Sequence, residues 1–518
     1  MASQIRLIPA IFLPSIGNMV FVAVLGVLVF GIGNGILNDG DTGYHIRTGE
    51  VILKTGRVPN RDIFSSHVPA LKWTAHEWLA EVVMAAVFKA TGLTGVVLFF
   101  ALLLSTTHWL LYQMLKSKSQ SCIPVLLLTL LATATSSSHW LARPHVFSIL
   151  FTLVWAYLLD RFQYRNDYTL IWLPVLMVFW VNLHGGFFIG IVLLVIYITG
   201  NILHSFAGFP EQAREHRRKA KVLLAYLIVT LGASLLNPLG ADILLFPVKL
   251  ASDRFIMDRV IEFLSPNFHD VLPFKYMLLT TIGVLALSRV TLNLIEIGLV
   301  LLFTYMALYS ARHVSLFAII IAPLLLKGAD SAIRNLPTRL FKFYESRDRN
   351  LSSIDANVRG FLWPSLAIIF VIVLALDGNL RFTFSEKRFP VAAVEFIKHE
   401  NIPGKMFNND EFGDYIIFAA WPKYRVFMDG RSDMYGEKFG APYLKVANVQ
   451  PGWKNVLSQY KIDWIIFDTE SALSAALREQ EDWQPIYSDA VATIYLKKNG
   501  PNESLLAKYP SVTLPSYK

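Results

Sequence analysis

The sequence predicts an α-helical, polytopic membrane protein with a small C-terminal α/β domain. Of its 518 residues, 54% are hydrophobic and only 16% are charged, whereas soluble domains are about 45–50% apolar and about 25% charged. Apolar runs recur along the chain at the length of about 20 residues that a helix needs to cross about 30 Å of hydrocarbon. After residue 377 the composition becomes polar. We therefore expect a transmembrane domain at 1–377 and a second domain at 378–518.

About eleven transmembrane helices are expected in the first domain. The first one follows a short basic N-terminus without a small-residue cleavage site, so we expect a retained helix and not a removed signal peptide. The spans are expected at 17–37, 94–115, 122–138, 146–160, 169–184, 186–204, 222–236, 274–288, 292–309, 313–326 and 361–377. Residues 38–92 form the first outer loop, in which the amphipathic segment 76–89 is expected to lie as a helix at the membrane interface.

The basic residues indicate the orientation of these helices. The net charge is +9, and the charge concentrates at 214–221 and 327–359, between apolar runs. Such clusters are typical of cytoplasmic loops, and they argue against nucleic-acid binding. We expect a multi-pass protein of the bacterial cytoplasmic (inner) membrane, with a cytoplasmic N-terminus and an extracytoplasmic C-terminal domain. The single cysteine, Cys122, excludes a disulfide scaffold and a cysteine metal site.

The C-terminal domain alternates strand-like and helix-like runs. Residues 425–428 and 464–467 are expected to be strands, and residues 391–399 and 452–460 are expected to be helices. This alternation predicts a small α/β domain.

The first candidate residues for chemistry are Asp39 and Asp41, at the outer end of the first helix. Two carboxylates two residues apart project to the same side of an extended segment. They can share a divalent cation such as Mg or Mn, or one can act as a base while the other tunes it. His45 can bind a phosphate or assist proton transfer. The structural alternative is a helix-capping turn, which Asp and Asn favour.

Cations at the expected outer helix ends form a second group of candidates. Arginine and histidine at the depth of the membrane surface suit a lipid phosphate. The group consists of Arg143, His145, His184, Arg312 and His313. Each alone has a structural explanation, because arginines near helix ends snorkel and lone histidines are often hydrogen-bonded structural groups. Five on one side favour a shared site. Further candidates in the outer loops are Asp62, His76, Glu77, Arg254 and Glu262.

Short blocks of sequence resemble the GT-C superfamily of membrane glycosyltransferases, and more closely an uncharacterised bacterial group of polytopic GT-C-like proteins. The blocks start at Asp39 (Asp-Gly-Asp-Thr-Gly-Tyr-His), Pro59 (Pro-Asn-Arg-Asp-Ile-Phe-Ser), His76 (His-Glu-Trp-Leu), Ala142 (Ala-Arg-Pro-His), Trp180 (Trp-Val-Asn-Leu-His-Gly-Gly), Asn237 (Asn-Pro-Leu-Gly), Ala311 (Ala-Arg-His) and Asp429 (Asp-Gly-Arg-Ser-Asp-Met-Tyr-Gly). The first block departs from the group, because Gly43 and Tyr44 replace a tryptophan pair.

The resemblance implies an inverting glycosyltransferase that moves a sugar from a polyprenyl-phosphate donor to an envelope acceptor on the outer face of the membrane. It implies that Asp41 is the catalytic base or metal-organising carboxylate, with Asp39 second. The five cations are expected to bind the donor phosphate, while Arg254 and Glu262 gate the site or contact the acceptor.

Two other functions stay open. A lipid or glycan transporter or flippase needs ionisable residues along a path through the bilayer, and often paired repeats with broken helices at mid-depth. A non-catalytic glycolipid-binding membrane scaffold would keep the fold without the chemistry, and the departures at Gly43 and Tyr44 leave this reading open.

Overall fold

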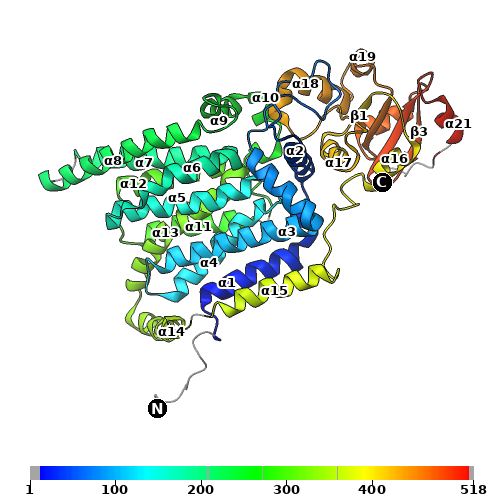
Figure 1. The fold of residues 1–518 in the computed structure, drawn as a ribbon. Helices are drawn as coiled ribbons and strands as arrows, with labels where there is room; N and C mark the ends of the chain where they lie inside the picture. Colours follow the sequence, from blue (N-terminus) through cyan, green and yellow to red (C-terminus); the bar gives the residue numbers. More distant parts are fainter. Residues whose placement is uncertain are drawn as a thin grey trace.

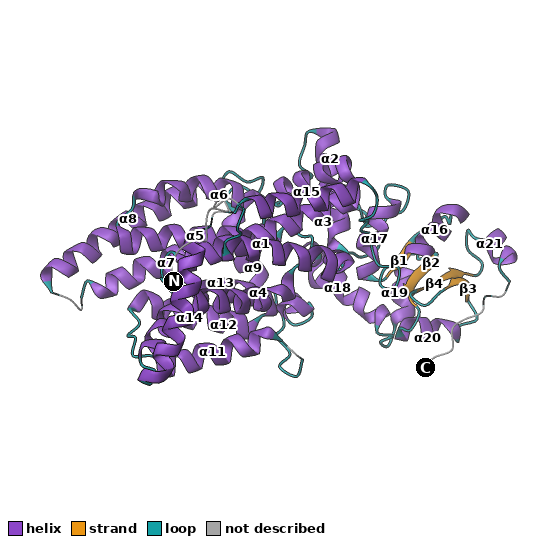
Figure 2. Ribbon diagram, turned by 90° about the horizontal axis from the view of Figure 1, so that it is seen from below, coloured by secondary structure: helices purple, strands orange, loops and turns teal. Residues whose placement is uncertain are grey.

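Long apolar helices pack side by side over most of the chain, and a small mixed domain lies at one end of them (Figure 1). The computed structural model describes residues 12–206, 209–270, 272–356, 358, 360–510 and 512. Seen from below, the strands of the C-terminal domain lie apart from the helical bundle (Figure 2).

Each of the eleven predicted apolar segments lies on a helix of the bundle. These helices are α1 (Ile16–Gly26, continued by irregular turns to Leu37), α3 (Trp78–Lys116), α4 (Cys122–Ser136), α5 (His145–Arg165), α6 (Trp172–Leu183), α7 (Phe188–His204), α8 (Pro210–Ser234), α11 (Pro273–Leu287), α12 (Leu294–Tyr309), α13 (Val314–Arg334) and α15 (Leu362–Leu376). By length and composition, six helical segments of the described residues can cross a membrane, and four more are shorter apolar helices.

The side chains of the bundle sort into an interior and a lipid-facing surface. Trp155, Trp180 and Phe317 are fully buried between helices, while Leu301 and Phe370 are exposed on the outside of the bundle. Apolar side chains on the outer surface are expected where the surrounding medium is lipid, because the lipid tails are themselves apolar.

Four further helices lie outside the run of apolar spans. They are α2 (Asp41–Thr55), α9 (Asp242–Ser252), α10 (Arg254–Met257) and α14 (Thr338–Ala356). In Figure 1, α2, α9 and α10 lie toward the end of the bundle that carries the C-terminal domain, and α14 lies at the other end.

The first outer loop differs from the expected extended segment. Asp41 is the first residue of the helix α2, because the Asp39 carboxylate accepts the Asp41 N–H (2.9 Å) and so satisfies a free donor at the helix start. Segment 76–89 corresponds to the beginning of α3, which is interrupted at Gly92 (φ 65°) before the apolar part of that helix.

The C-terminal domain is built around a four-stranded sheet of order β1-β2-β4-β3, with β1 parallel to β2 and the other pairs antiparallel. The strands are β1 (Met406–Asn408), β2 (Trp464–Asp468), β3 (Trp483–Ser488) and β4 (Ala492–Lys497). The helices are α16 (Val391–Glu400), α17 (Asp410–Ala420), α18 (Ser432–Ala447), α19 (Trp453–Gln459), α20 (Ala472–Arg478) and α21 (Glu503–Lys508).

One strand prediction in this domain is wrong. Residues 425–428 are extended but do not join the sheet. Val426 instead forms an isolated bridge with Ser65, in which the Val426 N–H donates to the Phe64 carbonyl (3.1 Å) and the Ser66 N–H donates to the Val426 carbonyl (2.8 Å). The extended backbone at Val426 therefore pairs with the first outer loop instead of the sheet. These hydrogen bonds connect the C-terminal domain to residues 64–66.

Candidate functional site

The loop that carries Arg143 is held directly against the start of α2. The Ala142 N–H donates to the carbonyl of Ile36 (2.9 Å), and the Thr42 hydroxyl donates to the carbonyl of Ala142 (3.0 Å). These two bonds place Arg143, which lies two residues before α5, opposite the carboxylates at the start of α2.

Three carboxylates bind the Arg143 guanidinium. Its Nη1 lies 2.6 Å from Asp39 Oδ2 and 2.5 Å from Glu262 Oε1, and its Nη2 lies 2.7 Å from Asp41 Oδ2. Such charge-assisted bonds are roughly twice as strong as neutral ones. Because one positive charge faces three carboxyl groups, the cluster retains a proton or attracts another cation.

Glu262 brings a carboxylate from the loop after α10 into this cation cluster. The loop is held by the Ser310 hydroxyl, which donates to the Glu262 carbonyl (3.0 Å), and by Arg312, which lies 5.2 Å over the Phe263 ring. Burial raises the pKa of Glu262, but Arg143 and Arg312 outweigh burial and hold this pKa well below its usual range. Glu262 is therefore an anion that the predicted phosphate-binding cations already hold.

Arg312 and His184 are directly connected. Nη2 of Arg312 lies 3.1 Å from Nε2 of His184, and the other ring nitrogen of His184 lies 2.7 Å from the Ser148 hydroxyl. The Trp180 indole also donates to Ser148 (2.7 Å). Glu77 Oε1 lies 3.7 Å from His184 Nε2. The pair of Arg312 and His184 is thus oriented by Ser148 of α5 and by Glu77, the residue just before α3.

The remaining predicted histidines, His145, His76 and His313, have different neighbours. His145 contacts the carbonyl of His139 through Nε2 (2.7 Å), and its ring lies 6.4 Å from that of His184. His76 stacks near Phe246, with ring centroids 4.4 Å apart. His313 follows Arg312 in the turn between α12 and α13.

Two predicted residues lie away from the cluster. His45 is buried and pairs with Glu81 of α3 (3.3 Å), so it does not contact the carboxylates that bind Arg143. Arg254 is exposed and lies 3.8 Å from Asp258, its only ion-pair partner among the described residues. Of the two candidates in the middle outer loop, Glu262 therefore pairs with Arg143, whereas Arg254 pairs with Asp258.

Sequence reasoning missed a buried carboxyl group of the C-terminal domain, Asp414. It lies on α17, which packs against α2, and both of its carboxyl oxygens accept the N–H of Gly430 (3.1 and 3.2 Å). A Cβ atom at Gly430 would lie 2.1 Å from Asp41 Oδ1 and 2.9 Å from Asp414 Oδ2. A side chain at position 430 would therefore displace the carboxyl oxygens of Asp41 and Asp414. The Asp429-Gly430 block was the available sequence signal, although it equally suits a tight turn.

The meeting of these carboxyl groups changes their acidity. Burial raises the pKa of Asp41 to about 8, with Arg143 opposing this rise and Asp39 and Glu262 adding to it. Burial, followed by the charges of Asp41 and Asp429, raises the pKa of Asp414 well above its usual range. Near neutral pH, Asp41 is therefore close to its point of titration, and Asp414 holds its proton more strongly than an exposed aspartate does.

Arg431 joins the first outer loop to the C-terminal domain. It binds Asp429 through Nε (2.8 Å) and Nη2 (2.7 Å), and Nη2 also binds Asp62 Oδ1 (2.8 Å). All three side chains are buried, and the Arg431 guanidinium lies 4.5 Å over the Trp73 ring. Asp62 in turn accepts the N–H of Phe64 (3.0 Å). Asp62 thus serves in an interdomain network.

The expected divalent cation on Asp39 and Asp41 does not fit this geometry. Asp39 and Asp41 each direct a carboxyl oxygen at the Arg143 guanidinium. This positive group takes the place between the two carboxylates that a shared metal ion would occupy. Across the described part of the chain, no group of three or more His, Cys, Asp or Glu side chains is placed to hold a metal ion.

The sequence matches no protein-family model and no curated protein, but the fold matches solved structures. One is the archaeal oligosaccharyltransferase AglB from Archaeoglobus fulgidus, in complex with an inhibitory peptide and a dolichol-phosphate. It has 9% identity and a TM-score of 0.52 over 93% of this chain and 74% of that chain. Another is ArnT from Cupriavidus metallidurans bound to undecaprenyl phosphate, with 13% identity and a TM-score of 0.48 over 92% of this chain and 97% of that chain.

Both solved proteins are membrane glycosyltransferases of the GT-C superfamily. The match to AglB covers nearly the whole chain, so this protein has the GT-C fold, and the resemblance read from its sequence blocks is confirmed at the level of the fold.

Proposed function

We propose that this protein is an inverting glycosyltransferase that transfers a sugar from a polyprenyl-phosphate donor to an acceptor on the outer face of the bacterial cytoplasmic membrane. The observation that carries this proposal is the pair of arginines, Arg143 and Arg312, at one end of the bundle around the Glu262 carboxylate. Two arginines that act on the same carboxylate, Glu262, at the membrane surface suit a lipid phosphate in its place.

The donor phosphate would replace Glu262 between these arginines. Both carry only donors, and arginine matches the geometry of phosphate oxygens. His184, already bonded to Arg312, would keep that guanidinium directed at the phosphate. When the bond from the anomeric carbon to the phosphate oxygen breaks, the electron pair leaves with the phosphate, and the arginines stabilise the charge that develops there. His145 and His313 are further candidates for this subsite.

Asp41 would act as the base. The acceptor hydroxyl loses its proton to the Asp41 carboxylate while its oxygen bonds to the anomeric carbon from the side opposite the lipid phosphate, which inverts the centre. A base is most effective when its pKa lies near the working pH, and burial raises the pKa of Asp41 to about 8. Asp39 would orient Arg143, and no step requires a metal ion.

The orientation in the membrane follows from charge. The basic segments at 214–221 and 327–359 lie at the end of the bundle away from Asp41, as α14 shows in Figure 1. With these segments in the cytoplasm, the site and the C-terminal domain lie outside. The partners would be membrane lipids, a lipid-linked sugar and an envelope acceptor.

Mass spectrometry of co-purified lipids tests the donor site. Wild-type protein is compared with the Arg143→Ala/Arg312→Ala double variant, and Arg254→Ala is the matched control because Arg254 is an exposed arginine of the same outer surface. We expect a polyprenyl-phosphate sugar with the wild type and the control, and its loss from the double variant. Ordinary phospholipids alone in all three samples would contradict a polyprenyl-phosphate donor.

The co-purified sugar lipid then allows a test of catalysis. Asp41→Asn is expected to retain this lipid but to abolish transfer to an acceptor fraction from the envelope. Transfer at the wild-type rate would remove Asp41 from the mechanism. Lipid retained by the wild type with no transfer to any acceptor would favour the non-catalytic scaffold, and movement of the lipid across a vesicle membrane would favour the flippase.

A further inference from the structure

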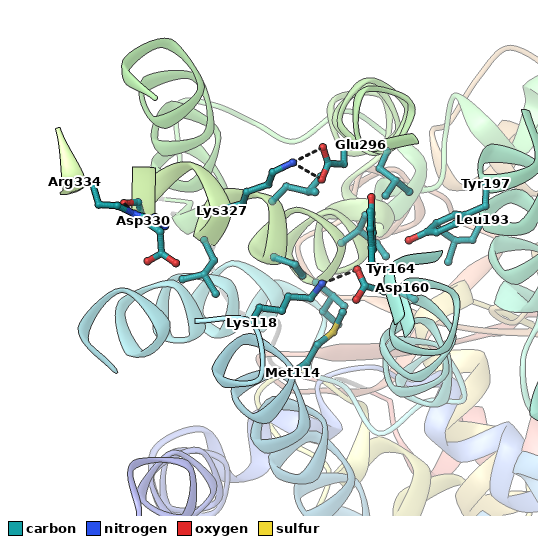
Figure 3. A pocket seen from close by; sticks show the side chains of 17 residues that line it. Met114, Lys118, Asp160, Tyr164, Leu193, Tyr197, Glu296, Lys327, Asp330 and Arg334 are labelled. Atoms are coloured by element: carbon teal, nitrogen blue, oxygen red, sulfur yellow. Dashed lines mark hydrogen bonds and ion pairs between the residues drawn. The ribbon is translucent and has the colours of Figure 1, made fainter. Parts of the chain in front are cut away.

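A cavity lies between the helices, apart from the cluster around Arg143. Its volume is about 400 Å³, within the range of about 300–1,000 Å³ that is usual for small-ligand sites. Figure 3 shows side chains of α3, α5, α7, α12 and α13 around it. The proposed function uses none of these residues.

The cavity and the cluster around Arg143 lie at opposite membrane surfaces. On α5, His145 belongs to the cluster side, and Tyr164, which lines the cavity, lies near the other end of the same helix. At 1.5 Å per residue the two are about 28 Å apart along the helix, which is close to the thickness of the hydrocarbon core. The cavity is therefore at the basic end of the bundle, level with lipid headgroups.

The lining changes from apolar to charged toward this end. On α13, the cavity-lining residues from Ile319 to Leu326 are apolar, and those from Lys327 to Arg334 are charged. The same order occurs at the end of α3, where Met114 is followed by Lys118 just past the last helical residue, and on α5, where Ala156 is followed by Asp160. A ligand that matches the lining of all three helices has an apolar part toward the membrane interior and a charged part at the membrane surface.

The charges of the lining balance. Three cations, Lys118, Lys327 and Arg334, face three carboxylates, Asp160, Glu296 and Asp330. Lys118 lies 2.6 Å from Asp160 and Lys327 lies 2.8 Å from Glu296, as the dashed lines in Figure 3 show. Arg334 is exposed and has no ion pair among the described residues, although its Nε donates to the Asp330 carbonyl (3.2 Å). It is the cation most available to a ligand.

We infer that this cavity binds one zwitterionic phospholipid from the membrane leaflet at the basic end. Its phosphate would pair with Arg334, its ammonium group would pair with Asp330, and one acyl chain would lie along α13 past Pro323. Sites for anionic lipids are basic. Here Lys118 and Lys327 already pair with Asp160 and Glu296, so Arg334 and Asp330 are left as one charge of each sign, which favours a headgroup that carries both signs.

The test is native mass spectrometry of the full-length protein after detergent washing and reconstitution into vesicles of equal parts phosphatidylethanolamine and phosphatidylglycerol. Two variants alter the cavity in different ways. Ala156→Phe fills its apolar part without changing charge, and Arg334→Ala removes the available cation. Arg217→Ala is the matched control, because Arg217 is exposed on α8 at the same end of the bundle and does not line the cavity.

The wild type and the control are expected to retain one phosphatidylethanolamine per protein. Each cavity variant is expected to retain about tenfold less, the effect of losing about 1.4 kcal/mol. Equal retention in all four proteins would overturn the inference, as would a preference for phosphatidylglycerol. A polyprenyl phosphate bound in this cavity would overturn it too, whereas the donor test on Arg143 and Arg312 does not depend on this result.

Discussion

Gly43 of α2 lies so close to Asp414 of α17 that no side chain fits between them. A Cβ atom at Gly43 would be 2.7 Å from the Asp414 carbonyl oxygen and 2.8 Å from the Cβ of Phe418. A glycine at position 43 is therefore the condition for direct contact between the first outer loop and the C-terminal domain.

This contact predicts a steric effect at Gly43. Gly43→Ala is expected to lower the free energy of unfolding by about 1–3 kcal/mol, because a backbone oxygen cannot move away as a side chain can. Thermal unfolding in detergent measures the loss. Gly232→Ala is the control, since a Cβ there meets nothing within 4 Å. Equal melting temperatures for Gly43→Ala and the wild type would show that α2 and α17 are not tightly packed.

The position of Glu262 predicts competition with the donor. Glu262→Gln removes one of the three carboxylates that bind Arg143, so undecaprenyl phosphate is expected to bind about tenfold more tightly, the effect of about 1.4 kcal/mol. Microscale thermophoresis in detergent measures the affinity. Asp258→Asn, a change of an exposed carboxylate in the same outer region, should leave it unchanged. Weaker binding to Glu262→Gln would show that Glu262 contributes to the phosphate site.

The acidity of Asp41 predicts how stability changes with pH. Its pKa of about 8 in the folded state is above the unfolded value of about 3.9, so between these values the folded protein holds a proton that the unfolded chain has lost. This proton makes stability fall as the pH rises from about 4 to 8. Asp41→Asn should make the melting temperature fall less over that range, whereas Asp258→Asn should not. Parallel curves for wild type and Asp41→Asn would contradict the raised pKa.

The burial of Arg431 predicts a large loss of stability. Arg431→Met leaves Asp62 and Asp429 buried without their cation, and breaking a buried pair in this way costs about 3–5 kcal/mol. Thermal unfolding and limited proteolysis of the C-terminal domain measure the loss. Arg425→Met, at an exposed position of the same domain, should have little effect. A stable Arg431→Met variant would mean that the network does not hold the domains together.

The sequence by itself determined the helical bundle and its apolar segments. Hydrophobicity over about 20 residues is a local property, so each predicted segment lies on a helix. It also predicted strand β2 and helices α16 and α19. Residues 425–428 were misassigned because their extended backbone pairs with Ser65, hundreds of residues earlier in the chain, and not with the sheet.

Only the tertiary structure decided which candidates act together. Asp41, Arg143, Glu262 and Asp414 come from four separate regions of the chain, and no local pattern records that they meet. The sequence suggested Arg143 and Asp41 by residue type. It could not show that the positive charge beside Asp39 and Asp41 is the guanidinium of Arg143 and not a metal ion. It gave no reason to choose Asp414, because the acidity of a buried carboxyl group depends on neighbours that only folding brings together.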